Sequence, residues 1–228
     1  MQLGEFWVIL VVGIIALAVF IYSQCFSYKR SKDLITWAQS KDFTYSLDPH
    51  YDLGRRFPGF NCLNSGQDRY AKNLMEGFIR GRKFIAFDYH YSTGSEKYKT
   101  DHDFSALIML SPFPLKSLLI RPENIADKLA AAVGFDDIDF ESAEFSRKFF
   151  VKSPDNRWAY DVISQPMMEY LLSSGHCFLQ LDIMHIIVWL PVLFSPADFE
   201  SAANFLVGFL DLLPDYLVKQ QSQLLKNN

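Results

Sequence analysis

The feature that most constrains this chain is an apolar run close to its start. Residues 6–22 read FWVILVVGIIALAVFIY, without a charged side chain or a proline. Extended to Phe26, the uncharged stretch would form a helix about 31 Å long at ~1.5 Å per residue, close to the ~30 Å thickness of a bilayer's hydrocarbon layer. The run therefore predicts one transmembrane helix, from Phe6 to Phe26, and a protein held in a membrane.

Charges flanking the run predict its orientation. Glu5 is the only charged side chain before it, whereas Lys29, Arg30 and Lys32 follow it closely. The positive-inside rule then predicts a single-pass protein of the inner (cytoplasmic) membrane whose C-terminal domain is cytoplasmic. A cleaved signal peptide is the alternative, but the basic start and the small residues of a cleavage site are both absent.

Composition predicts that the rest of the chain folds. Hydrophobic residues make up 50% and aromatic residues 16% of the sequence, more than a disordered tail carries. The net charge of −4 argues against nucleic acid as a partner, because phosphate binding needs a concentrated basic surface. Three widely spaced cysteines without a Cys-x-x-Cys pair indicate neither a disulfide framework nor a zinc site.

The pattern of turn residues and periodicity divides the chain into three parts. Residues 1–28 are the anchor and the start of the juxtamembrane segment. Residues 29–73 form a juxtamembrane helix and a loop-rich connector, whose later part is dense in glycine, proline and asparagine. Residues 74–228 form the cytoplasmic domain.

That domain is predicted to be α+β with a mainly antiparallel sheet, because its strands come as hairpins between helices. A doubly wound α/β fold is the alternative. Strands at 78–91 and 104–110 form a long-loop hairpin, and strands at 178–181 and 185–190 a terminal hairpin. The remaining predicted elements are strands at 115–120 and 149–152 and helices at 122–134, 143–147, 166–174 and 195–213.

The first hairpin carries the sharpest candidate for chemistry. Alternation along its first strand places Asp88 and His90 on one face, and the second strand begins Asp101-His102-Asp103. If the loop folds symmetrically about Glu96, these carboxylates and imidazoles lie opposite one another, as a divalent metal site or a proton-transfer pair requires. A shift of one residue in register removes that constellation, so the favoured interpretation is a solvated polar face without a catalytic or metal role.

Other motifs are weaker, and no cofactor is expected. A calcium loop starting at Asp137 would have Ser142 and Lys148 where glycine and a bidentate glutamate are needed, so an acidic helix N-terminus is favoured. His176 and Cys177 are neighbours on an extended segment and point to opposite faces. Phosphate-binding glycine loops and the Gly-x-Ser-x-Gly elbow are absent from the sequence.

Several strings resemble a bacterial family of uncharacterised single-pass membrane-anchored proteins that carry a domain of unknown function. They are RGRKFIAFDYHYSTGS at 80–95, the segment from LLIRPENIADK at 118 to MMEYLL at 172, and the closing strands and helix. The resemblance spans roughly residues 30–213. It implies an anchor followed by one cytoplasmic α+β domain, and it carries over no activity, cofactor or catalytic residue.

The sequence favours a membrane-anchored interaction or scaffold module without catalysis. A metal-dependent or acid-base enzyme using the hairpin cluster, or a lipid- or small-ligand-binding domain, are the alternatives. On the helix after Ser195, Phe205 and Leu212 fall on a flank outside the main apolar stripe. We expect this flank to be covered by Tyr216 and Leu217 of the tail or to bind a second copy of the domain or another membrane protein.

Overall fold

The computed structural model describes residues 3–123, 138, 140–175 and 177–226. It contains a six-stranded sheet in the order β1-β2-β3-β4-β5, with β6 paired to β4. All pairings between these strands are antiparallel, which confirms the predicted α+β class and excludes the doubly wound alternative. The strands are β1 Thr44–Ser46, β2 Gln67–Ile79, β3 Arg82–Thr93, β4 Thr100–Pro122, β5 Phe149–Lys152 and β6 Phe178–Leu190.

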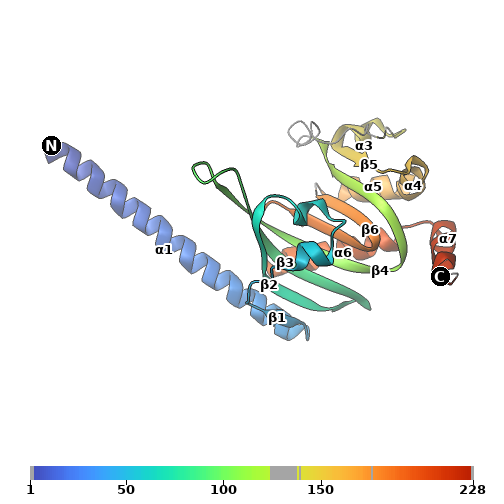
Figure 1. The fold of residues 1–228 in the computed structure, drawn as a ribbon, viewed down its shortest axis with the longest axis horizontal. Coiled ribbons are helices and arrows are strands. Elements are labelled where there is room, and N and C mark those ends of the chain that lie inside the picture. Colours follow the sequence, from blue (N-terminus) through green and yellow to red (C-terminus); the bar gives the residue numbers. More distant parts are fainter. Residues whose placement is uncertain (1–2, 124–137, 139, 176, 227–228) are drawn as a thin grey trace.

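One helix dominates the outline of the molecule. Helix α1, Leu3–Ser40, extends away from the domain over its N-terminal part and lies against the domain over its last turns (Figure 1). The other helices are α2 Leu53–Arg56, α3 Ala143–Lys148, α4 Asn156–Val162, α5 Gln165–Ser173, α6 Pro196–Asp211 and α7 Asp215–Lys226, with a 3₁₀ turn at Asn61–Leu63.

Taken singly, the described helices do not meet the length and hydropathy criteria for a membrane span. None combines the required length and hydropathy. Within α1 the apolar stretch covers Leu10–Ile21, and α6 passes only as a pair with Asp215–Leu225 of α7, bent by 90°.

Two apolar layers enclose the sheet. Alternating residues of β3 point to opposite faces: Phe84 and Ala86 join the large core covered by the helices, whereas Ile85 and Phe87 join a smaller one. The segment between β1 and β2 covers the smaller core with buried Leu53, Phe57, Phe60 and Leu63. Residues 47–66 are therefore packed into the domain, and the predicted division at residue 73 falls inside β2.

The strand boundaries differ from the sequence prediction at three places. The strand predicted at 78–91 contains the β2–β3 turn, where Arg80 and Gly81 have positive φ. The strands predicted at 104–110 and 115–120 are one strand, β4, because the prolines between them lie at a bulge where pairing to β6 is interrupted. The predicted terminal hairpin is also one strand, β6, with Ile183 at φ 47° in place of a turn.

Helix prediction was more accurate. Helices α3, α5 and α6 lie where expected, and Ser195 and Asp198 form a capping box at the start of α6. The sequence prediction missed α2, α4 and α7. The helix predicted at 122–134 and the acidic run around Asp137 fall almost entirely outside the described residues.

Candidate functional site

The best-defined polar site joins α1 to the sheet. Arg30 lies one turn before Leu34 and two turns before Trp37 and Ala38, so it shares their face. That face packs on the sheet, since Leu34 and Ala38 are fully buried. The Arg30 guanidinium is consequently carried into the domain, where its side chain is 10% exposed.

The acceptor is Asp88 of β3, whose side chain is fully buried. Nη1 of Arg30 donates to Oδ2 of Asp88 at 2.7 Å, and Nη2 donates to Oδ1 at 2.8 Å. This two-point geometry matches the planar guanidinium to the carboxylate and is among the strongest hydrogen-bonded pairings available to a protein.

Neighbouring strands satisfy the remaining lone pairs of Asp88. Asn73 of β2 donates its amide to Oδ2 at 2.7 Å, and the Ser105 hydroxyl of β4 donates to Oδ1 at 2.5 Å. Asn73 can reach the carboxylate because it lies in a β2 bulge with φ 51°. Three strands and α1 thus converge on one carboxylate.

The loop after β6 closes the site. Nε of Arg30 donates to the Phe194 carbonyl at 2.8 Å, and the Phe194 amide donates to the Ser105 hydroxyl oxygen at 2.9 Å. On the other side, the Tyr45 hydroxyl donates to Asn73 Oδ1 at 2.6 Å. Burial, followed by the nearby Asp88 carboxylate, raises the pKa of Tyr45 to about 12, so its hydroxyl stays protonated as a donor.

We call this set the anchor junction: Arg30, Tyr45, Asn73, Asp88, Ser105 and Phe194. Its donors and acceptors are mutually satisfied, which is the condition under which a buried ion pair is retained without a large penalty. Both oxygens of Asp88 are already engaged by protein donors, which occupy the positions that a metal would need. The geometry suits rigid attachment of a helix to a sheet.

The predicted hairpin cluster is only partly assembled. The register pairs His90 with Asp103 and Ser92 with Asp101, one residue away from the pairing of His90 with His102 that folding about Glu96 would give. His90 Nδ1 lies 3.4 Å from Asp103 Oδ1, and Nε2 lies 3.9 Å from Asp101 Oδ1. Asp88, however, pairs with Ser105 further along the hairpin and belongs to the anchor junction.

The other members of this cluster have ordinary partners. His102 lies on the face of the ribbon opposite to His90 and Asp103. There it contacts the Thr93 hydroxyl at 2.8 Å and stacks on Tyr91. Asp103 also accepts from Lys72 at 3.3 Å. Among the described residues, no group of three or more histidine, cysteine, aspartate or glutamate side chains has an arrangement that could hold a metal ion.

We expect the purified parent chain to bind no more zinc or manganese than the variant that combines His90→Gln with Asp103→Asn. The two side chains lie at the end of an exposed ribbon without a third ligand at coordinating distance, which a metal centre needs. Metal content after dialysis against each ion is the measurement. Stoichiometric metal in the parent that is absent from the double variant would revive the enzyme hypothesis.

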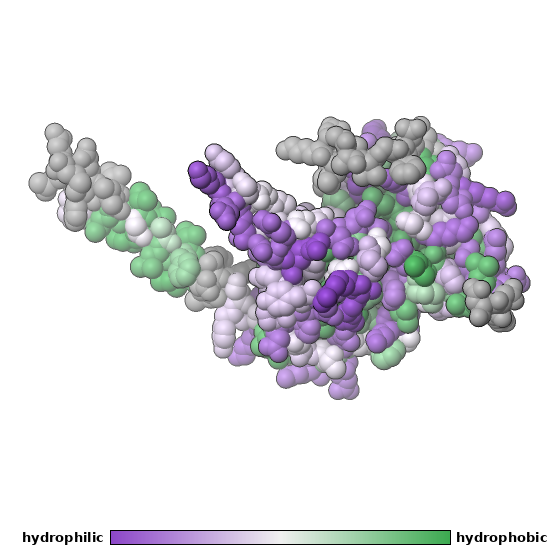
Figure 2. Space-filling view, viewed as in Figure 1, coloured by the Kyte–Doolittle hydropathy of each residue, from purple (hydrophilic) through white to green (hydrophobic). Residues whose placement is uncertain are grey.

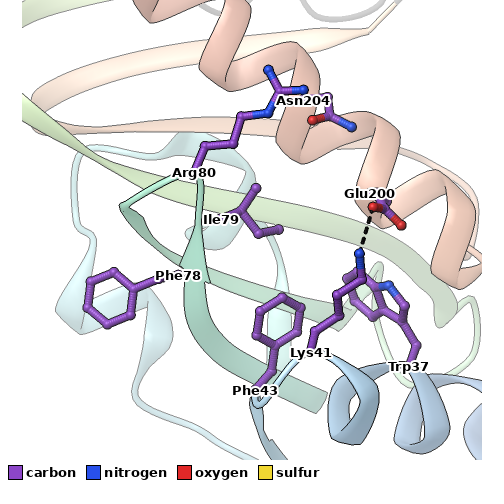
Figure 3. A pocket seen from close by; sticks show the side chains of 8 residues that line it. All are labelled: Trp37, Lys41, Phe43, Phe78, Ile79, Arg80, Glu200 and Asn204. Atoms are coloured by element: carbon purple, nitrogen blue, oxygen red, sulfur yellow. Dashed lines mark hydrogen bonds and ion pairs between the residues drawn. The ribbon is translucent and has the colours of Figure 1, made fainter.

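A shallow groove lies where α1, β2 and α6 meet (Figure 3). It encloses about 330 Å³, at the lower end of the ~300–1,000 Å³ of ligand pockets. The Lys41 ammonium lies 3.0 Å from Glu200 and so ties α1 to α6 across the groove. With Arg80 and Asn204 also lining it, the groove fits a solvated joint between elements better than an apolar ligand site.

The predicted interaction flank on α6 is covered within the chain. Phe205 is 9% exposed and stacks on Tyr170 of α5, with ring centroids 5.6 Å apart and planes within 5°. The Tyr170 hydroxyl also donates to the Phe205 carbonyl at 2.9 Å. Leu212 is half-buried against the same core. The cover on Phe205 thus includes α5, whereas the sequence suggested the tail.

Sequence reasoning missed most of the anchor junction. Arg30 was interpreted only as a marker of membrane orientation, although its spacing to Leu34, Trp37 and Ala38 was a signal that it faces the domain. Asp88 was assigned to a polar face with His90. Its neighbours on that face, Phe84 and Ala86, could have indicated burial instead.

Comparison with known proteins adds one likeness in fold. No protein-family model matches the chain, and no curated protein matches it. Among solved structures, the mycobacterial trehalose monomycolate transport factor A, TtfA, superposes with a TM-score of 0.59 at 17% sequence identity. The likeness covers 80% of this chain and 93% of that one. At this identity the two proteins are similar in fold.

Proposed function

We propose that this chain is a single-pass membrane protein of the inner membrane whose cytoplasmic domain is a non-catalytic interaction or scaffold module. One observation carries the proposal. Helix α1 continues without a break from an apolar stretch into a docking segment, and a buried ion pair locks that segment to the sheet.

The exposure of the apolar stretch supports an anchor. Every described side chain between Leu10 and Ile21 is exposed, including Val12 at 59% and Leu17 at 59%. Figure 2 shows this stretch as an apolar rod outside the largely polar domain. A helix that is apolar all round is favoured in lipid and costly in water.

The polar sites of the domain support a role other than catalysis. Asp88 is engaged by four donors, and the His90 cluster lies on an exposed ribbon. The neighbour of similar fold is named a transport factor, which is in keeping with a module that assists another membrane component. The bacterial family resemblance seen in the sequence implies the same arrangement of anchor and domain.

Charging the apolar stretch tests the anchor. Ile14→Arg with Leu17→Arg should release the chain from membranes, because each arginine at the centre of a span costs about 2.5–3.5 kcal/mol of insertion. Flotation of membranes on a density gradient is the measurement. Both positions are exposed, so the domain should keep its circular dichroism spectrum.

The matched control introduces two arginines at the same spacing further along α1, beyond the apolar stretch. Thr36→Arg with Gln39→Arg alters exposed positions and should leave the chain in the membrane fraction. A C-terminal reporter that matures only outside the cytoplasm should give no signal in the parent. Release of the control variant, retention of the charged variant or an active exported reporter would contradict the proposal.

A further inference from the structure

The tip of the β3–β4 hairpin, residues 94–99, projects beyond the rest of the sheet. The pairing of β2 with β3 ends at Gln67 and Ser92, and the pairing of β6 with β4 begins only at Ser105. Backbone pairing with both neighbouring strands therefore stops before the tip, and β2 reaches it only through side chains, with Gln67 Nε2 donating to the Gly94 carbonyl at 3.3 Å. In Figure 1 the tip extends on the side of the domain toward which the N-terminal part of α1 also extends.

The tip has a defined turn. Gly94 has φ 89°, and a Cβ there would lie 2.3 Å from the Tyr98 carbonyl oxygen, so the close approach requires glycine. The Tyr98 amide donates to the Ser95 carbonyl at 2.7 Å. This geometry presents Tyr98 at the end of the ribbon, where it is 80% exposed.

The residues beside Tyr98 are basic. Lys97 and Lys99 flank it. Lys99 is paired with Asp68 at 2.9 Å, so Lys97, which follows Glu96, is the lysine available to a lipid phosphate. A tyrosine between lysines is the combination that favours the lipid headgroup layer, because the ring prefers the interface and the ammonium groups attract phosphate.

The anchor junction ties this tip to α1. Asp88, which holds Arg30, lies on β3, the strand that runs on to the tip. The docked part of α1 and the hairpin are thus joined through one strand, and the direction of α1 decides where the tip lies relative to the membrane.

We propose that the β3–β4 tip is a second membrane contact, with Tyr98 in the headgroup layer and Lys97 beside lipid phosphates. The inference rests on the proposed anchor. The two contacts together would limit the tilt of the domain relative to the bilayer, which a single helix leaves free.

Tryptophan substitution tests the contact in the full chain. In vesicles of phosphatidylcholine and phosphatidylglycerol, lipids brominated on their acyl chains should quench the emission added by Tyr98→Trp at least twofold. The parent spectrum is subtracted, because the chain has four native tryptophans. Tyr216→Trp is the control: Tyr216 is 56% exposed on α7, at the other end of the domain (Figure 1), and should be unaffected.

The outcomes separate this inference from the anchor. If the chain floats with vesicles but the brominated lipids quench both added tryptophans equally, the tip contact is wrong and the anchor stands. If the chain does not float, both are wrong. Lys97→Glu in the Tyr98→Trp chain should lower the quenching, and unchanged quenching would overturn the role of the lysine.

Discussion

Asp88→Ala should destabilise the domain by about 3–5 kcal/mol, the usual cost of removing one partner of a buried ion pair. The Arg30 side chain is only 10% exposed, so the substitution leaves its charge buried without a counter-charge. It also deprives Asn73 and Ser105 of their acceptor. Denaturant unfolding of the full chain in detergent, followed by tryptophan fluorescence, measures the loss.

The matched control is Asp103→Ala on the neighbouring strand. The Asp103 side chain is 38% exposed, and its pairing with Lys72 is a surface ion pair worth at most about 1 kcal/mol. Arg30→Ala with Asp88→Ala should cost clearly less than the sum of the two single variants, since the orphaned charge is removed. Equal losses for Asp88→Ala and Asp103→Ala would show that the anchor junction does not hold α1.

Phe205→Glu should unfold the domain or weaken it by more than about 3 kcal/mol. The change removes a buried aromatic side chain, for which truncation alone costs about 3–5 kcal/mol, and places a carboxylate in its position. The stacking on Tyr170 is lost as well. Thermal unfolding by circular dichroism gives the magnitude.

Ser201→Glu is the control for this variant. It lies one turn earlier on α6 and is exposed, so the free energy of unfolding should change by no more than about 0.5 kcal/mol. If Phe205→Glu folds as stably as Ser201→Glu but loses self-association, the flank is an interaction surface after all, and the Tyr170 cover is not formed in solution.

The sequence alone determined the elements whose signals are local. The α+β class followed from hairpins interrupted by helices, and the start of α6 followed from its serine, proline and aspartate. Such features depend on residues close together in the chain, so the pattern contains the necessary information.

Only the tertiary structure decided which polar residues work together. Arg30 and Asp88 are 58 positions apart, and nothing in either segment specifies the other as its partner. The same holds for Tyr170 over Phe205, 35 positions apart. The continuity of β4 also depended on context, because cross-strand pairing on both sides of a bulge outweighs the local tendency of proline to end a strand.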